Sequence, residues 1–178
     1  RGPPIAGDRQ PILIRAGALG PGTPARDLVV SGQHRVLLRW RAVWRMYGVR
    51  DVLAPAKGLT GLPGVRRKRG VRRVDYVHLL LPRHEVIWAE ATPTESFYPG
   101  DTILRSFDAA VRADLFAAMP ALSHGAAQAL GPPARLCISV QDTHALVRAH
   151  RADLRAERAK WDDDHAVECA LPPLNRAS

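Results

Sequence analysis

Apolar and polar positions in the first part of the chain follow a pattern of short apolar runs separated by turn-forming residues. Residues 11–16, 28–30 and 36–40 are such runs, and Gly, Pro, Ser or Asp stands between them. Runs of this length with these boundaries are typical of strands in a β domain. Residues 54–59 allow a short helical turn, and residues 41–52 fit neither the strand nor the helix period.

The longest apolar signal lies in residues 74–100, VDYVHLLLPRHEVIWAEATPTESFYPG. If residues 76–81 form a strand, both of its faces carry mainly apolar side chains, and His78 lies on one face. This pattern predicts a buried strand. Residues 84–90 form a second strand-like run. Pro82 and Arg83 between the runs do not suit the two-residue primed turn of a tight hairpin. A bent long strand and a hairpin therefore both stay open.

The pattern changes to a helical period after residue 101. Ser106 is placed to cap a helix over residues 107–119, which Pro120 would end. Asp142 or Thr143 is placed to cap a second helix that reaches about residue 161. We therefore expect two domains, a β domain over residues 1–101 and a helical extension over residues 102–178. The last residues, from 162 on, are expected to fray.

Composition supports a folded domain and gives little support to polyanion binding. The 178 residues are 46% hydrophobic, enough for a real core. The net charge is +9, but the lysines are only Lys57, Lys68 and Lys160, and such an arginine bias is typical of GC-rich genomes. The basic run 66–69 is either a phosphate-binding loop or a solvated hairpin tip. It has no interleaved aromatic residue for stacking on bases, which favours the tip.

The cysteine pattern predicts neither a disulfide scaffold nor a metal centre. Cys137 and Cys169 lie far apart and form no CxxC motif. His165 stands four residues before Cys169, but two ligands in a terminus do not make a zinc site. We expect no metal, no cofactor and no membrane span, since no apolar run reaches about 18 residues. The chain begins RGPPIAGDRQ rather than with Met, so we expect a fragment or a processed product.

Ser31 and His34 form the first candidate site, in a polar turn between two predicted strands. An imidazole that titrates near neutral pH can protonate a leaving nitrogen, and a hydroxyl can donate to a developing oxyanion. The spacing places both groups within reach of one amide. A capped turn without catalytic function explains the same spacing equally well.

A second candidate group consists of His78 and His84, with Glu90 and Glu95 nearby in sequence. Histidines in a sheet are more often buried structural residues, satisfied by hydrogen bonds, than catalysts. Both interpretations of these histidines remain open on the sequence alone.

Taken in order, these segments resemble the bacterial Hint (hedgehog/intein) domains. The resemblance rests on RQPILIRAGALGPGTPARDLVVSGQHRVLL at 9–38, DVLAPAKGLTG at 51–61 and VDYVHLLLPRHEVIWAEATPTESFYPGD at 74–101. It implies a compact, mainly β fold of two pseudo-symmetric halves, incomplete here at its N-terminus and followed by an α-helical extension. It also implies autoprocessing, in which a Cys or Ser attacks the preceding carbonyl in an N-to-S or N-to-O acyl shift.

The resemblance also implies roles for individual residues. The family's Thr-x-x-His block matches Ser31 to His34, so His34 would destabilise and protonate the scissile amide nitrogen while Ser31 orients it. His84 falls where the family keeps its second-half histidine. His78 falls where inteins commonly carry an acid, and we include it among the candidate catalytic residues.

Two departures from the family limit the expected activity. The nucleophile that opens such domains has no counterpart before Arg9, and no His-Asn splicing end is present. We expect this chain to be inactive alone and, with its own upstream polypeptide as substrate, to cleave once rather than turn over repeatedly. The alternatives are a non-catalytic β interaction module and a basic nucleic-acid-binding domain. No specific nucleic acid or membrane partner is expected, and the sequence sets no cellular location.

Overall fold

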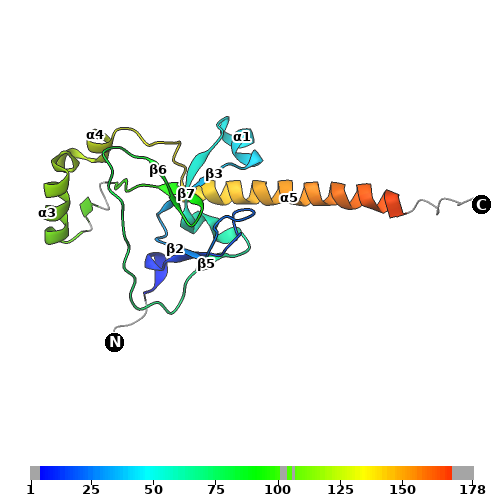
Figure 1. The fold of residues 1–178 in the computed structure, drawn as a ribbon, viewed down its shortest axis with the longest axis horizontal. Helices are drawn as coiled ribbons and strands as arrows, with labels where there is room; N and C mark the ends of the chain where they lie inside the picture. Colours follow the sequence, from blue (N-terminus) through cyan, green and yellow to red (C-terminus); the bar gives the residue numbers. More distant parts are fainter. Residues whose placement is uncertain (1–4, 101–103, 106, 170–178) are drawn as a thin grey trace, which may run out of the picture.

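The computed structural model describes residues 5–100, 104–105 and 107–169 (Figure 1). The strands are β1 Ile12–Ile14, β2 Leu28–Val30, β3 Arg35–Leu38, β4 Val52–Pro55, β5 Val65–Arg67, β6 Val86–Ala89 and β7 Thr92–Glu95. The α-helices are α1 Arg41–Tyr47, α3 Ala109–Ala118, α4 Ala126–Leu130 and α5 Val140–Cys169. The 3₁₀ helices of the described residues are η1 Gly7–Arg9, η2 Ala56–Gly61 and η3 Pro120–His124.

The strands form two small antiparallel sheets. One sheet has the order β2-β1-β5 and the other the order β4-β3-β7-β6. The second sheet gains a short parallel partner at its β4 edge, where Leu53 bridges to Cys137. Two antiparallel sheets with helices agree with the expected mainly β fold and its helical C-terminal part.

The main hydrophobic core lies between the two sheets, α1, η2 and the start of α5. Its strands bury apolar side chains because their short runs face other elements on both sides. Fully or almost fully buried members include Ile12, Ile14, Val36, Leu38, Val43, Val52, Leu59, Leu146 and Val147. A smaller second cluster, around Leu122 and Leu130, holds the helical segments α3, η3 and α4 together.

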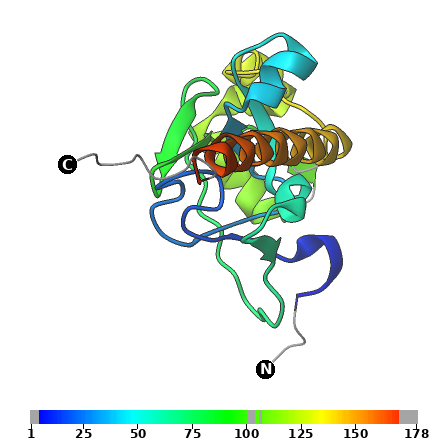
Figure 2. The same cartoon turned by 90° about the vertical axis from the view of Figure 1, so that its right-hand side faces the viewer.

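Helix α5 is anchored in the core at one end and leaves it at the other (Figure 1). Its first turns bury Thr143, Leu146 and Val147, and the helix packs most closely against η2. Figure 2 is turned by 90° from Figure 1, and in this view α5 lies in front of the strands. Residues 155–161 are exposed. The C-terminal helix is therefore part of the core in its first turns and solvent-exposed over residues 155–161.

A tight hairpin joins β6 to β7 and ties the two sheets together. Its turn residues Glu90 and Ala91 have φ of 49° and 57°, the left-handed region in which non-glycine residues are strained. Arg26, just before β2, donates to both carboxylate oxygens of Glu90, at 2.8 and 2.7 Å. The amide of Ala25 donates to the carbonyl of Glu90 at 2.7 Å. These contacts hold the turn against the loop that leads into β2.

Replacement of Ala91 by glycine is expected to stabilise the fold by about 0.5 kcal/mol. Relief of the left-handed strain exceeds the extra entropy that glycine gives the unfolded chain. Urea denaturation followed by circular dichroism measures the change. Ala89→Gly, in the strand beside the turn, is the control and should destabilise by roughly 0.5–1 kcal/mol. Equal destabilisation by both variants would contradict the strained turn.

Several local predictions are confirmed. Strands β1, β2 and β3 lie within or close to the apolar runs at 11–16, 28–30 and 36–40. The ambiguous segment 41–52 contains helix α1, which ends where Gly48 adopts φ of 67°. A glycine in this conformation is a common helix stop. The strand-like run at 84–90 contains β6, but neither a hairpin nor a bent strand turns at Pro82 and Arg83; the hairpin of this region joins β6 to β7 at residues 90–91 and was not predicted.

The prediction of a buried strand at residues 76–81 is wrong. Residues 73–82 form no strand, and the exposed fractions of Tyr76, Val77 and Leu79 are 38%, 88% and 54%. The segment does keep one strand-like contact, in which the amide of Phe97 donates to the carbonyl of Leu79 at 2.8 Å. The apolar pattern is that of a strand, but within the described residues no neighbouring strand pairs with it. A sheet-forming pattern without a partner strand stays irregular.

Helix boundaries differ from the predictions at three points. Helix α5 begins at Val140, and Ser139 caps it: its hydroxyl accepts from the Asp142 amide at 3.0 Å, so neither Asp142 nor Thr143 is the cap. Helix α3 is capped by Asp108, whose carboxylate accepts from the Val111 amide. Ser106 lies outside the described residues. Helix α5 also continues to Cys169, where fraying was expected from residue 162.

Candidate functional site

Ser31 and His34 lie in the four-residue connection between β2 and β3. The His34 amide donates to the Ser31 carbonyl and to the Ser31 hydroxyl oxygen, both at 3.2 Å. The turn is therefore capped by Ser31, as one interpretation of the sequence predicted. Capping uses the hydroxyl as an acceptor, so its own proton remains available for donation. Both side chains are half-buried.

Two neighbouring clefts meet at these residues. Their volumes are about 500 Å³ and about 250 Å³. Both are lined by Ser31, His34, His78, Glu95 and Phe97. The fold therefore brings together three of the four predicted site residues and adds a carboxylate that the sequence gave no role.

His78 reaches the clefts from the irregular segment after β5. Its ring lies 4.7 Å from the ring of Phe97, at a tilt of 41°. The residue is exposed at the edge of the site rather than buried in a sheet. Its role as a catalytic residue stays a prediction.

Glu95 is the most tightly held charged group in the site. Its Oε1 accepts from the Arg35 amide and its Oε2 from the Arg35 guanidinium, each at 2.8 Å. Its side chain is only 8% exposed. This contact follows from the register in which Val36 pairs with Thr94. The sequence placed Glu95 near the candidate histidines, but only the strand pairing shows its contact with Arg35, because the two residues are 60 positions apart.

His84 lies behind Glu95 and is absent from the lining of both clefts. Its side chain is fully buried. Its Nδ1 accepts from the Ala134 amide at 3.1 Å, and its Nε2 faces Glu95 Oε2 at 3.5 Å. Its ring stacks on Tyr98 at 4.4 Å. His84 thus contacts the site through Glu95 and not through the cleft.

The electrostatics of the site favour neutral imidazoles beside a charged carboxylate. Burial lowers the pKa of His34. The negative charge of Glu95 acts to raise this pKa, whereas His78 and Arg35 lower it further. Partial burial against its neighbours also lowers the pKa of His78, again opposed by Glu95. Burial acts to raise the pKa of Glu95, but His84 and Arg35 outweigh it and the pKa is lowered. At neutral pH, His34 can accept a proton and Glu95 stays ionised.

Within the described residues, β2 is the outer strand of its sheet, and its unpaired edge lines one wall of the larger cleft. The Arg15 amide donates to the Gly64 carbonyl. In an antiparallel pair the residues alternate between facing the partner strand and facing away from it, so the backbone groups of Leu13, two residues earlier, also face β5. Val29, opposite Leu13 in β2, therefore directs its own backbone groups away from β1. The cleft wall is apolar, with Val29 and Trp88 exposed by 36% and 68%. An extended peptide can bind to such an edge through its main chain.

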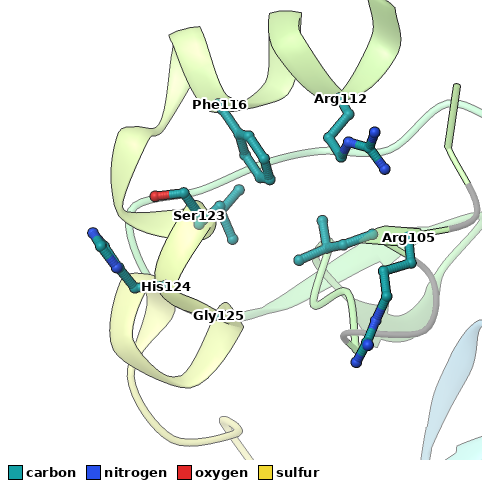
Figure 3. A pocket seen from close by; sticks show the side chains of 8 residues that line it. Arg105, Arg112, Phe116, Ser123, His124 and Gly125 are labelled. Carbon is teal, nitrogen blue, oxygen red and sulfur yellow. The ribbon is translucent and has the colours of Figure 1, made fainter. Parts of the chain in front are cut away.

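Metal-binding clusters, membrane-spanning helices and the pocket among the helical segments offer no competing site within the described residues. No group of three or more His, Cys, Asp or Glu side chains there could hold a metal ion. No helix within residues 5–100, 104–105 and 107–169 is long and apolar enough to cross a membrane. A pocket of about 290 Å³ lies among the helical segments. In Figure 3 the ring of His124 and the guanidinium of Arg105 point away from Arg112, so the basic groups do not converge.

Comparison with known protein families gives a match. A family model described as a Hint domain matches residues 3–101. No curated protein and no solved structure matches the chain. The matched residues include Ser31, His34, His78 and Glu95, together with both sheets.

Proposed function

This chain belongs to the Hint domain family, and we propose that it promotes self-cleavage of a polypeptide attached on its N-terminal side. The observation that carries the proposal is the shared lining of the two clefts, which places Ser31, His34 and His78 around one space. The substrate is a peptide bond of the same polypeptide, so each molecule reacts once.

The proposed reaction is an acyl shift from nitrogen to sulfur or oxygen. A Cys thiol or Ser hydroxyl attacks the carbonyl carbon of the preceding residue and transfers its proton to neutral His34. The tetrahedral intermediate collapses with cleavage of the C–N bond, and His34 returns the proton to the leaving amine. A thioester or ester results. Attack by water or an added thiol then releases the upstream segment as a carboxylic acid or a new thioester.

Ser31 and His78 complete the proposed site. The Ser31 hydroxyl donates its proton toward the scissile carbonyl oxygen, where negative charge develops. His78, on the open side of the cleft, contacts the leaving amine or the released carboxylate. Glu95 opposes the effect of burial on both imidazoles. Because burial still prevails, both rings are in the neutral form that proton uptake requires.

The nucleophile is proposed to lie in the attached polypeptide. Cys137 is unsuited: its Sγ contacts the Arg135 carbonyl at 3.6 Å, beside β4. Burial raises the pKa of its thiol, with an opposing effect of Arg35 and a supporting one of Glu95. A thiol with a raised pKa is a poor nucleophile. We therefore expect no cleavage by the chain of residues 1–178 in isolation.

Replacement of His34 by alanine is expected to slow cleavage roughly 10²- to 10⁴-fold, the usual contribution of a general acid–base group. The reading frame is extended upstream of residue 1, expressed, and incubated with and without thiol. Fragments are followed by gel electrophoresis and mass spectrometry. The wild-type precursor should give, with thiol, an upstream fragment that ends at the residue before the nucleophile and a downstream fragment that begins with the nucleophile.

The matched control is His124→Ala, which removes an exposed histidine in η3, outside both clefts. It should cleave at the wild-type rate. A folded wild-type precursor that stays intact with thiol would overturn the proposal, as would a His34→Ala precursor that cleaves normally.

A non-catalytic interaction module is the second candidate. The exposed apolar side chains beside the larger cleft, Val77, Leu79 and Trp88, favour it because they would be covered by a bound peptide. An intact precursor that binds an extended apolar peptide, measured by fluorescence anisotropy, would support this function in place of cleavage.

A further inference from the structure

The segment between α4 and α5 makes direct contacts with residues of the Hint domain site. This segment, residues 130–134, lies beyond the region matched by the family. The His84 amide donates to the Leu130 carbonyl at 3.2 Å. The Tyr98 hydroxyl donates to the Gly131 carbonyl at 2.9 Å, and the Ala134 amide donates to His84 Nδ1. We call residues 130–134 the strap.

The strap determines which nitrogen of His84 carries the proton. Nδ1 accepts a hydrogen bond from a backbone N–H, so in neutral His84 it has no proton. The proton is then on Nε2, which lies 3.5 Å from Glu95 Oε2 and makes no hydrogen bond within the described residues. The stacked ring of Tyr98, itself bonded to the strap, limits rotation of the imidazole. The orientation of His84 thus depends on three contacts: the Ala134 amide of the strap, Glu95, and the ring of Tyr98, which is itself bonded to the strap.

Glu95 is held between His84 and Arg35. Arg35 binds both carboxylate oxygens, and His84 faces the second of them. On its other side the carboxylate lines both clefts beside His34 and His78. A displacement of His84 would therefore also displace the Glu95 carboxylate, whose charge acts on the imidazoles of His34 and His78.

We propose that the strap is a positioning element of the cleavage site, which acts by holding His84 against Glu95. The inference rests on the proposed function for its effect on cleavage, but the arrangement of His84 and Glu95 can be tested without it. The helical part of the chain then contributes to the site, although it lies outside the family-matched residues. Neither His84 nor the strap touches the substrate, so both are positioning rather than catalytic.

The test compares Ala134→Pro, which removes the amide donor, with Ala134→Gly, which keeps it. The first readout is nuclear magnetic resonance of the histidine rings in the protein of residues 1–178. In wild type and Ala134→Gly, neutral His84 should be the Nε2–H tautomer. In Ala134→Pro it should become a mixture, and the pKa of His34 should fall because Glu95 is less firmly held beside it. The charged or titratable groups around Glu95 are Arg35, His34, His78, His84, Tyr98 and Cys137.

A second pair of variants guards against a folding defect of the proline. His84→Gln keeps a donor that reaches Glu95, whereas His84→Asn can accept from Ala134 but is too short to reach Glu95. His84→Gln should leave the titration of His34 close to wild type, and His84→Asn should lower its pKa. Unchanged His34 titration in both Ala134→Pro and His84→Asn would overturn the proposal.

Cleavage of the extended precursor gives the second readout. Ala134→Pro should slow cleavage roughly 10- to 100-fold relative to Ala134→Gly, the scale of a small misplacement of reacting groups. Equal rates would overturn the positioning role. If no precursor cleaves, the proposed function fails, while the tautomer of His84 and the pKa of His34 still decide whether the strap positions Glu95.

Discussion

Replacement of Glu95 by alanine is expected to lower the free energy of unfolding by about 3 kcal/mol. The change leaves the Arg35 guanidinium in a mostly buried position without its carboxylate, and removal of one partner of such a pair is costly. Arg35 Nε already has no hydrogen-bond partner, so the loss of Glu95 leaves the guanidinium poorly satisfied. Urea denaturation followed by tryptophan fluorescence measures the difference.

Glu85→Ala is the matched control for this variant. Glu85 is in the same hairpin region, but its side chain is 51% exposed and its contact with Arg83 is long, 3.8 Å. It should change stability by less than about 0.5 kcal/mol. A Glu95→Ala protein as stable as Glu85→Ala would contradict the buried ion pair.

The stability contributed by Glu95 should also depend on pH. Its pKa is lowered in the folded state, because His84 and Arg35 outweigh the opposing effect of burial. The contribution is therefore fully present above the unfolded pKa, near 4.5, and is lost as pH falls through the folded value. The difference in free energy of unfolding between wild type and Glu95→Gln should be constant above about pH 5.5. It should become smaller as the pH is lowered further.

Replacement of Gly58 by alanine should have an effect of similar size at the contact between η2 and α5. A Cβ on Gly58 would lie 2.5 Å from the Cβ of Thr143 and 2.7 Å from its methyl group. Thr143 is fully buried and its hydroxyl donates to the Ser139 carbonyl at 2.7 Å, so the side chain cannot turn away without losing that bond. Helix α5 must shift, at a cost of roughly 1–3 kcal/mol.

Gly61→Ala is the comparison that isolates this close approach. Its Cβ would meet only a methyl group of Val147, at 3.1 Å, and a side-chain end yields more easily than a helix backbone. We expect a clearly smaller loss of stability in thermal denaturation. A Gly58→Ala protein that melts at the wild-type temperature would show that α5 does not pack against η2 in this way.

The features that could be predicted from the sequence are those that depend on neighbouring residues. The strands β1 and β2 follow from short apolar runs between turn residues, and the Ser31 to His34 turn follows from its polar spacing. The resemblance of residues 9–101 to the Hint family is confirmed by the match over residues 3–101. Local patterns of this kind need no knowledge of what packs against them.

Residues distant in sequence decided the rest. The apolar periodicity of residues 76–81 indicates that a strand could form there. It does not indicate whether a partner strand exists. In the structure Tyr76, Val77 and Leu79 are exposed. The first half of α5 enters the core because Gly58 and Gly61 let a helix approach η2 closely.

The site itself shows the same division. Sequence alone determined that a serine and a histidine share one turn between two strands. Only the tertiary structure brought Glu95 to Arg35, placed His84 behind it, and set the strap against His84. The physical reason is that these contacts depend on strand register and on chain segments about 50 to 60 residues apart, which no local pattern encodes.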